Sequence, residues 1–152
     1  MMANNEADLI VFHRNLRIQD NEALSYGSIR QNYKCIYVFD EVYWSGNGKS
    51  LRQLYFLKDC LRELDNSLKK INSKLEIFIG NYKEFYKSLL NNKFTLHFNY
   101  STDIEYYKSQ FTKFLKLAKQ QYEIKVYNDF GVQRENFDRD QWSRFWENQM
   151  NK

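Results

Sequence analysis

Proline is absent from this 152-residue sequence, and glycine, with five residues, and cysteine, with two, are scarce. This composition excludes proline-rich motifs and flexible linkers. Cys35 and Cys60 lack metal-ligand spacing, so we expect two reduced, buried thiols and no metal site. No apolar run approaches the ~20 residues that span a bilayer, and the N-terminus lacks a basic start and a signal-peptide core. The sequence therefore predicts a cytoplasmic protein without a membrane segment.

A large charge excess and the common catalytic loops are missing as well. The net charge is +4, from 23 basic and 19 acidic residues, which is too small to indicate a nucleic-acid surface. No phosphate loop, dinucleotide fingerprint, nucleophile elbow or HExxH pair occurs. The sequence therefore predicts no catalytic residue. A hydrophobic content of 43% and an aromatic content of 18% nevertheless indicate one folded domain with a proper core.

Segments with strand character alternate with segments of helical period. The strands are expected at residues 9–12, 35–39, 75–79, 95–100 and 123–127, and helices at 21–29, 51–71, 83–90 and 103–121. Strands separated by helices of this length indicate an α/β fold: a Rossmann-like, doubly wound, five-stranded parallel sheet with helices on both faces. Lys113, Lys116 and Lys119 lie off the apolar stripe of the last helix, which indicates a solvated face. We assign this domain to residues 1–129.

Polar side chains follow three of the predicted strands, at the sheet edge where open α/β sheets bind ligands. We take these as candidates for a ligand pocket: Arg14, Asn15, Arg17, Asp40, Trp44, Tyr100, Asp103 and Tyr106. Guanidinium groups suit phosphate or carboxylate, and an indole can stack on a planar ring. Structural roles remain open, since Arg14 and Arg17 could pair with Asp20 or other acids and Trp44 could be a packing residue. His13 reads as a satisfied polar group, and His97 shows no partner.

The segment FHRNLRIQDNEAL resembles the N-terminal motif of the DNA photolyase and cryptochrome family, close to FRRDLRLxDNxAL. It departs from that motif at His13 and Asn15. The matching residues are Phe12, Arg14, Leu16, Arg17, Asp20, Asn21, Ala23 and Leu24. The tail is similar to a GVxRxLxxRDGWxxxWxxxM segment of a bacterial branch, through Gly131, Val132, Arg134, Arg139, Asp140, Trp142, Trp146 and Met150.

The resemblance covers nearly the whole chain but only about the first third of the family architecture. It implies the N-terminal domain of a deoxyribodipyrimidine photolyase-like protein, truncated before the helical domain that holds FAD and the lesion pocket. Family members use light and reduced FAD to repair pyrimidine dimers, a carbon–carbon lyase reaction. We therefore expect no FAD binding and no repair by this chain alone, with DNA bound only through the missing domain. Photolyase and cryptochrome ancestry both stay open.

The resemblance also implies an antenna chromophore in the α/β domain. Folate is disfavoured, because Asn47, Glu105 and Tyr106 stand where folate-binding members have His, Asn and Glu. A flavin or deazaflavin stays open. Two alternatives remain beside this interpretation: a free-standing nucleotide- or flavin-binding module, and a vestigial scaffold without activity.

Residues 130–152 form an aromatic-rich segment that leads to the FAD domain in full-length relatives. Asp138 or Asp140 could cap a final helix that carries Trp142, Phe145, Trp146 and Met150. If these side chains are exposed, we expect a homo-dimer through the tail, because large apolar patches mark interaction surfaces. A separately encoded helical FAD domain is the other expected partner.

Overall fold

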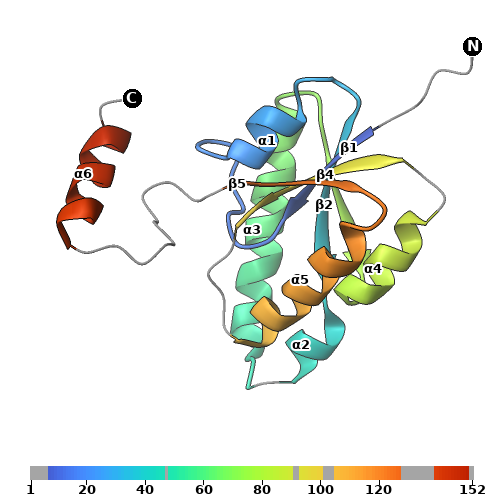
Figure 1. Cartoon of the computed structure of the whole chain (residues 1–152). Coiled ribbons are helices and arrows are strands. Elements are labelled where there is room, and N and C mark those ends of the chain that lie inside the picture. Colours follow the sequence, from blue (N-terminus) through green and yellow to red (C-terminus); the bar gives the residue numbers. More distant parts are fainter. Residues whose placement is uncertain (1–6, 47, 91–92, 101–104, 128–138, 151–152) are drawn as a thin grey trace, which may run out of the picture.

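The computed structural model describes residues 7–46, 48–90, 93–100, 105–127 and 139–150. Within them lies a five-stranded sheet in the order β3-β2-β1-β4-β5, with every pair parallel (Figure 1). The strands are β1 Ala7–Phe12, β2 Tyr33–Phe39, β3 Leu75–Ile79, β4 Phe94–Asn99 and β5 Glu123–Tyr127. The predicted parallel sheet is therefore confirmed, with each strand within two residues of its expected start.

The central strand is almost entirely buried because helices cover both of its faces. Leu9, Ile10, Val11 and Phe12 are each 1% exposed, as a continuous apolar run predicts. Successive residues point to opposite faces, so Leu9 and Val11 enter one core and Ile10 and Phe12 the other. The strand order reverses between β1 and β4, so the carboxyl edge beside β1 is the position where this architecture places ligands.

One face is covered by α1 (Glu22–Gly27) and α3 (Leu51–Lys69). Asn21 caps α1, because its side chain accepts from the backbone N–H of Leu24. A capping box of Ser50 and Gln53 begins α3. The tight packing of α1 requires Gly27, since a Cβ there would lie 2.6 Å from Cγ1 of Ile10.

The other face is covered by α4 (Tyr82–Leu89) and α5 (Glu105–Ala118), which contact each other. This core is aromatic: Tyr82, Phe85, Phe98, Phe111 and Phe114 contact one another through tilted, stacked and edge-to-face rings. Aromatic pairs of this kind add to the free energy gained from burial alone. This face of the sheet is therefore covered by closely packed aromatic side chains.

Two short elements complete the fold. The helix α2 (Glu41–Ser45) was not among the predicted helices, because five residues are too few to show a helical period. The helix α6 (Arg139–Met150) agrees with the expected tail helix and stands to the side of the sheet in Figure 1. Asp140 lies inside its first turn, and the alternative cap, Asp138, lies outside the described residues. No helix in the described part of the chain could span a membrane.

Candidate ligand site at the carboxyl edge of the sheet

The loop after β1 is held by its own charged residues. Nη2 of Arg17 lies 3.2 Å from Oδ2 of Asp20, and Nε of Arg17 donates to the carbonyl of Gln19. Asp20 has a φ of +50°, a left-handed conformation that reverses the chain before α1. The structural alternative for Arg17, pairing with Asp20, is therefore what the structure shows, although both side chains are largely exposed.

Two buried asparagines anchor the same loop to the sheet. The amide of Asn99, at the end of β4, donates to Oδ1 of Asn21 at 2.7 Å, and Oδ1 of Asn99 accepts from the N–H of Ala23. The amide of Asn21 in turn donates to the carbonyl of Arg17. These bonds satisfy buried polar groups at the point where the strand order reverses. They position the loop that begins at His13 over the carboxyl end of β1.

The short helix α2 presents aromatic side chains beside that loop. Asp40 is buried and caps α2 by accepting from the N–H of Tyr43. Trp44 lies parallel to Phe39, with ring centroids 6.2 Å apart, and edge-on to Tyr43. The ammonium of Lys49 lies 4.6 Å from the ring centroid of Tyr43 and 5.8 Å from that of Trp44, a cation–π arrangement. Trp44 thus packs against Phe39 and Tyr43, with Lys49 over its ring.

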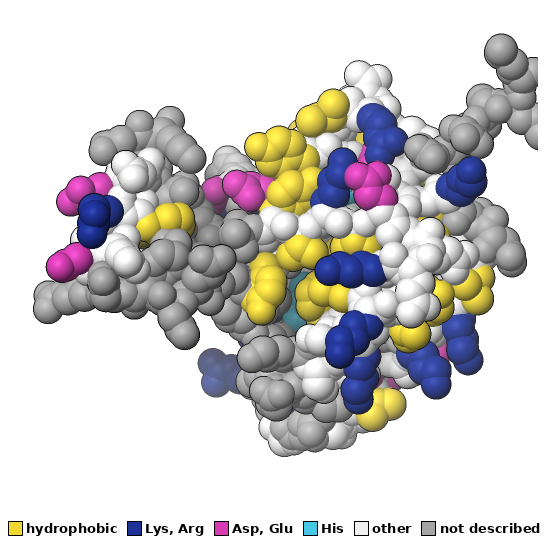
Figure 2. Space-filling view, in the orientation of Figure 1, with side chains coloured by type: hydrophobic (Ala, Val, Ile, Leu, Met, Phe, Trp, Pro, Cys, Tyr) yellow, Lys and Arg dark blue, Asp and Glu magenta, His cyan; other side chains and the backbone are white. Residues whose placement is uncertain are grey.

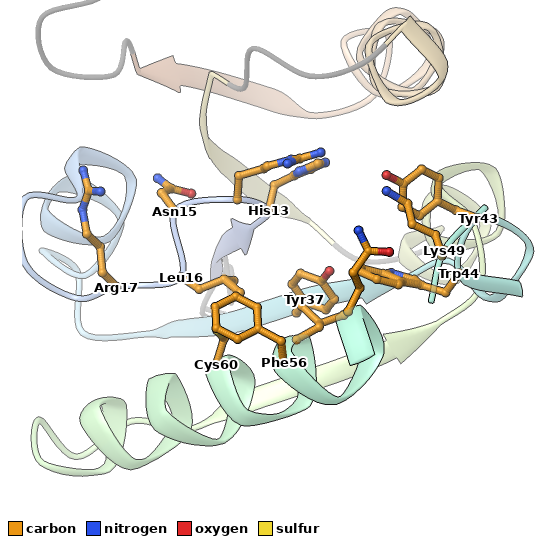
Figure 3. Close-up of a pocket in the computed structure, with 13 residues that line it drawn as sticks. His13, Asn15, Leu16, Arg17, Tyr37, Tyr43, Trp44, Lys49, Phe56 and Cys60 are labelled. Atoms are coloured by element: carbon orange, nitrogen blue, oxygen red, sulfur yellow. The ribbon is translucent and has the colours of Figure 1, made fainter. Parts of the chain in front are cut away.

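A cavity of about 470 Å³ opens between the loop after β1, α2 and the first turns of α3 (Figure 3). Small-molecule sites are typically ~300–1,000 Å³. The lining residues are His13, Arg14, Asn15, Leu16, Arg17, Tyr37, Tyr43, Trp44, Lys49, Gln53, Phe56, Leu57 and Cys60. Tyr37 and Phe56 lie across the middle of the cavity, and Arg17 lies at the end remote from Lys49.

The structure brings together half of the residues that the sequence singles out. Arg14, Asn15, Arg17 and Trp44 line the cavity, whereas Asp40 caps α2 beneath it. Tyr100 is not among the lining residues, and its N–H donates to the carbonyl of Tyr127 at the β4–β5 edge. Two further candidates, Asp103 and the side chain of Tyr106, lie outside the described residues.

Sequence reasoning missed the wall that α3 supplies. Gln53, Phe56, Leu57 and Cys60 follow the three- and four-residue steps of one helix face, and that spacing could have found them. Cys60 is therefore a half-buried thiol facing a cavity, which corrects the expectation of two buried thiols. Cys35 is fully buried, and burial raises the pKa of its thiol to about 11.

The chemistry of the lining favours an anion attached to an aromatic ring. Three side chains carry positive charge, Arg14, Arg17 and Lys49, and no carboxylate of a described residue lines the cavity. Aromatic rings and the apolar Leu57 form the remaining walls. Nε1 of Trp44 is buried and has no hydrogen-bond partner among the described residues, so an acceptor on a ligand could satisfy it.

A second polar cluster lies below α1, outside this cavity. Nε2 of His97 is 2.9 Å from Oδ1 of Asp8, and its Nδ1 is 2.9 Å from the hydroxyl of Tyr127. Arg30 donates to the same oxygen of Asp8. Burial raises the pKa of Tyr127 above its ordinary value. The sequence gives no signal for these partners of His97, because they come from strands remote from it in sequence.

Comparison with known proteins identifies relatives of the whole α/β unit. A sequence model of the DNA photolyase family matches residues 9–131. Cryptochrome-2 of Gallus gallus is 30% identical over 112 residues, which cover 72% of this chain and 19% of that protein. The (6-4)DNA photolyase of Arabidopsis thaliana is 35% identical over 89 residues, or 52% of this chain and 16% of that one. This chain thus spans less than a fifth of the length of these relatives.

Solved structures agree on the fold. An archaeal photolyase from Sulfolobus tokodaii, whose structure holds two FAD molecules with an implied novel light-harvesting cofactor, superposes with a TM-score of 0.72. The identity is 21%, and the match covers 93% of this chain and 35% of that one. A class III photolyase from Agrobacterium tumefaciens gives a TM-score of 0.66 at 14% identity, covering 97% and 32%.

Proposed function

We propose a function from one premise: the chain belongs to the DNA photolyase family. It forms the N-terminal α/β domain of that family, and we propose that this domain serves as a light-harvesting module. In this proposal the cavity beside β1 binds a flavin-type chromophore through its ring and its anionic group. A bound flavin would supply absorption of blue light and transfer of that energy to a neighbouring acceptor.

The observation that carries the proposal is the composition of the cavity wall. Tyr37, Tyr43, Trp44 and Phe56 provide flat apolar surfaces. Arg14 and Lys49 line the same cavity and provide positive charge. A flavin mononucleotide combines a planar ring with a phosphate, and both parts find matching groups here. The donor set therefore fits the chromophore, with Arg14 and Lys49 as the residues that would bind the phosphate.

The remaining site residues would have supporting roles. Asn15 and Gln53 line the cavity and offer amide groups to the polar edge of a ring. Asp40 would act indirectly, because it caps α2 and so positions Trp44. Arg17 would hold the loop through Asp20 and contribute long-range charge. A deazaflavin has a planar ring of the same shape, with carbon in place of one ring nitrogen, and a parallel titration with a deazaflavin compares the two affinities.

We propose further that the isolated chain does not repair DNA. The photolyase structures that it resembles are about three times as long, and this chain matches only 35% and 32% of them. Repair would require a helical FAD domain, joined to this chain or encoded separately. The purified chain should therefore leave pyrimidine dimers unchanged under blue light with added FAD, and dimer loss would overturn this part of the proposal.

The binding test is a fluorescence titration of the purified chain with flavin mononucleotide, followed by desalting and an absorbance scan. We expect a visible absorbance band to remain with the protein. The change Lys49→Ala removes a charge-assisted contact and should weaken binding about tenfold, equal to about 1.4 kcal/mol. The matched control is Arg52→Ala, which removes an exposed charge of α3 that does not line the cavity.

Two results would contradict the chromophore site. One is the absence of binding by flavin mononucleotide and by a deazaflavin, which would favour the scaffold interpretation. The other is an equal loss of affinity in the Lys49→Ala and Arg52→Ala variants, which would place the flavin elsewhere. Tight binding of a plain nucleotide without a flavin ring would instead favour a nucleotide-binding module.

The exposed tail favours a second property, a partner that covers α6. Trp142, Trp146 and Met150 are 45%, 37% and 58% exposed, and the two indole rings stack on each other. We propose that this surface pairs with a second copy of the chain or with the helical FAD domain. Light scattering at increasing concentration tests the dimer, and a monomer of constant mass would exclude it.

A further inference from the structure

Five lysines gather on the outer side of α4 and α5. They are Lys83, Lys87, Lys113, Lys116 and Lys119, and all are exposed. The two helices contact each other, so lysines 30 residues apart in sequence share one surface. Figure 2 shows Lys and Arg side chains over this part of the molecule with little acidic surface among them. We call these five residues the lysine face.

The lysine face gathers several basic side chains that have no acidic partner among the described residues. None of its five lysines forms an ion pair with a residue in the described ranges. Seven basic side chains elsewhere do pair with carboxylates, namely Arg17, Arg30, Lys34, Arg62, Lys69, Lys74 and Lys125. Glu84 on α4 is an acid whose side chain is described, and its carboxylate accepts from the N–H of Asn81 in a capping box, whereas the side chain of Glu105 on α5 lies outside the described part.

Three of the lysines surround a groove of about 400 Å³. Lys83 comes from α4, Lys113 and Lys116 come from α5, and Gln110, Phe114 and Leu117 complete the lining. The exposed apolar part of this groove is Leu117, which is 40% exposed. Among its described lining residues the groove therefore offers three point charges and one amide, and its aromatic ring, Phe114, is buried, so it gives an unpaired base no platform for stacking.

We propose that the lysine face binds the phosphate backbone of duplex nucleic acid without reading its sequence. Clustered lysines on one side of a domain are the electrostatic footprint of such binding. Base stacking would need exposed aromatic rings, and membrane insertion would need a larger apolar anchor, so a single strand and a lipid surface fit less well. The proposal departs from the expectation that DNA is contacted only through the missing domain.

This inference does not depend on the chromophore. None of the five lysines lines the proposed ligand cavity. The net charge of +4 does not reveal the lysine face, because the acidic residues that lower the net charge are concentrated elsewhere. Asp59, Glu63 and Asp65, for example, lie on α3, across the sheet.

The test is a fluorescence-anisotropy titration of the full chain with a labelled duplex of arbitrary sequence. Affinity should fall steeply with salt, and three phosphate contacts predict a loss of about 40-fold between ~50 and ~200 mM. The double change Lys113→Gln and Lys116→Gln should weaken binding several-fold and reduce the slope of log affinity against log salt by about 2. Two unrelated duplexes should bind with equal affinity.

The matched control is the double change Lys58→Gln and Lys70→Gln; both lysines are exposed, on or just after α3, and neither forms an ion pair with a described residue. Both double variants lose the same charge, so a non-specific effect would weaken them equally and would overturn the proposal. A circular dichroism melt confirms that each variant folds. The proposal also fails if the chain does not bind duplex at ~50 mM salt, or if it prefers anionic vesicles or a polyglutamate peptide.

Discussion

The two faces of the central sheet differ in what they bury. Under α4 and α5 the core is aromatic and continuous, with Phe114 in contact with four other rings. Under α1 and α3 the sheet buries ionisable and amide groups, among them Asp8, His97 and Asn99. The candidate cavity opens beside this second face. One side of the sheet is thus packed by aromatic rings, whereas the other buries a network of polar side chains and borders the cavity.

The solvent-exposed surfaces of the helices on the two faces also differ, in how their charges are balanced. The helix α3 carries bases and acids that pair along its length, such as Arg62 with Asp59 and Lys69 with Asp65. The lysine face on α4 and α5 has no such partner among the described residues. Exposed ion pairs contribute little to stability. The difference therefore affects the electrostatic field that a binding partner encounters. The polar face is thus charge-balanced outside, and the aromatic face is positive outside.

The largest effect should come from the aromatic face. Phe114 is 1% exposed, and Phe114→Ala would leave a cavity among Tyr82, Phe85 and Phe98. We expect a loss of about 3–5 kcal/mol in the free energy of unfolding, measured by urea denaturation. The control is Leu117→Ala on the exposed side of the same helix. If both variants lose equal stability, the aromatic core is not what holds this face.

An intermediate effect is expected from the polar network on the other face. Asp8→Ala would leave His97 and Arg30 without the carboxylate that both contact at under 3 Å. Breaking a buried pair by removing one partner should cost about 3 kcal/mol.

The companion variant is Tyr127→Phe, which removes only the hydroxyl that contacts Nδ1 of His97. We expect it to lower the free energy of unfolding by about 1 kcal/mol. Thermal unfolding of both variants measures the difference. Equal and small losses would show that the network contributes nothing beyond packing, and the contrast between the faces would then disappear.

The smallest expected effect is a pH-dependent change in stability that comes from Asp65 on α3. The N–H of Leu75 donates to Asp65, and this bond, with that from Lys69, lowers the pKa of the carboxyl. A carboxyl whose folded pKa lies below its unfolded value stabilises the fold above about pH 4, and this contribution is lost as pH falls through the folded pKa. Asp65→Asn should cost up to about 1 kcal/mol at pH 7, since solvent screens the pair.

Unfolding experiments across an acid series measure this contribution. The difference in stability between the parent chain and Asp65→Asn should shrink below pH 4. A difference that stays constant with pH would mean that the bond to Leu75, which an amide oxygen can also accept, provides the whole effect. A variant on the aromatic face, such as Phe114→Ala, should show no such convergence and serves as the comparison.

Much of the fold could be predicted because it depends on local pattern. Four-residue apolar runs predict buried strands, and three- and four-residue steps predict helices, so five strands and the long helices were expected where they occur. The short α2 was missed because no period is visible in five residues. Helix ends shifted by a few residues, as with α3, which ends at Lys69 where residue 71 was expected.

The candidate site could be predicted only in part. Strand ends directed attention to Arg14 and Trp44, which do line the cavity. The same rule also selected Tyr100, which lies at another position along that edge. Lys49 and Phe56 were missed because they come from the chain before and within α3, where no strand ends. The rule identifies the edge of a sheet, whereas a cavity also needs the helix that packs beside it.

By itself, the sequence determined the parallel sheet, its helices and the edge at which a ligand would bind, because alternation and helical period act between near neighbours in the chain. Only the tertiary structure decided which side chains meet. Asp8 and His97 are 89 residues apart in sequence yet 2.9 Å apart in space, and the lysines of α4 and α5 share a surface only after those helices pack together. Contacts of that range depend on strand order and packing, which no local pattern encodes.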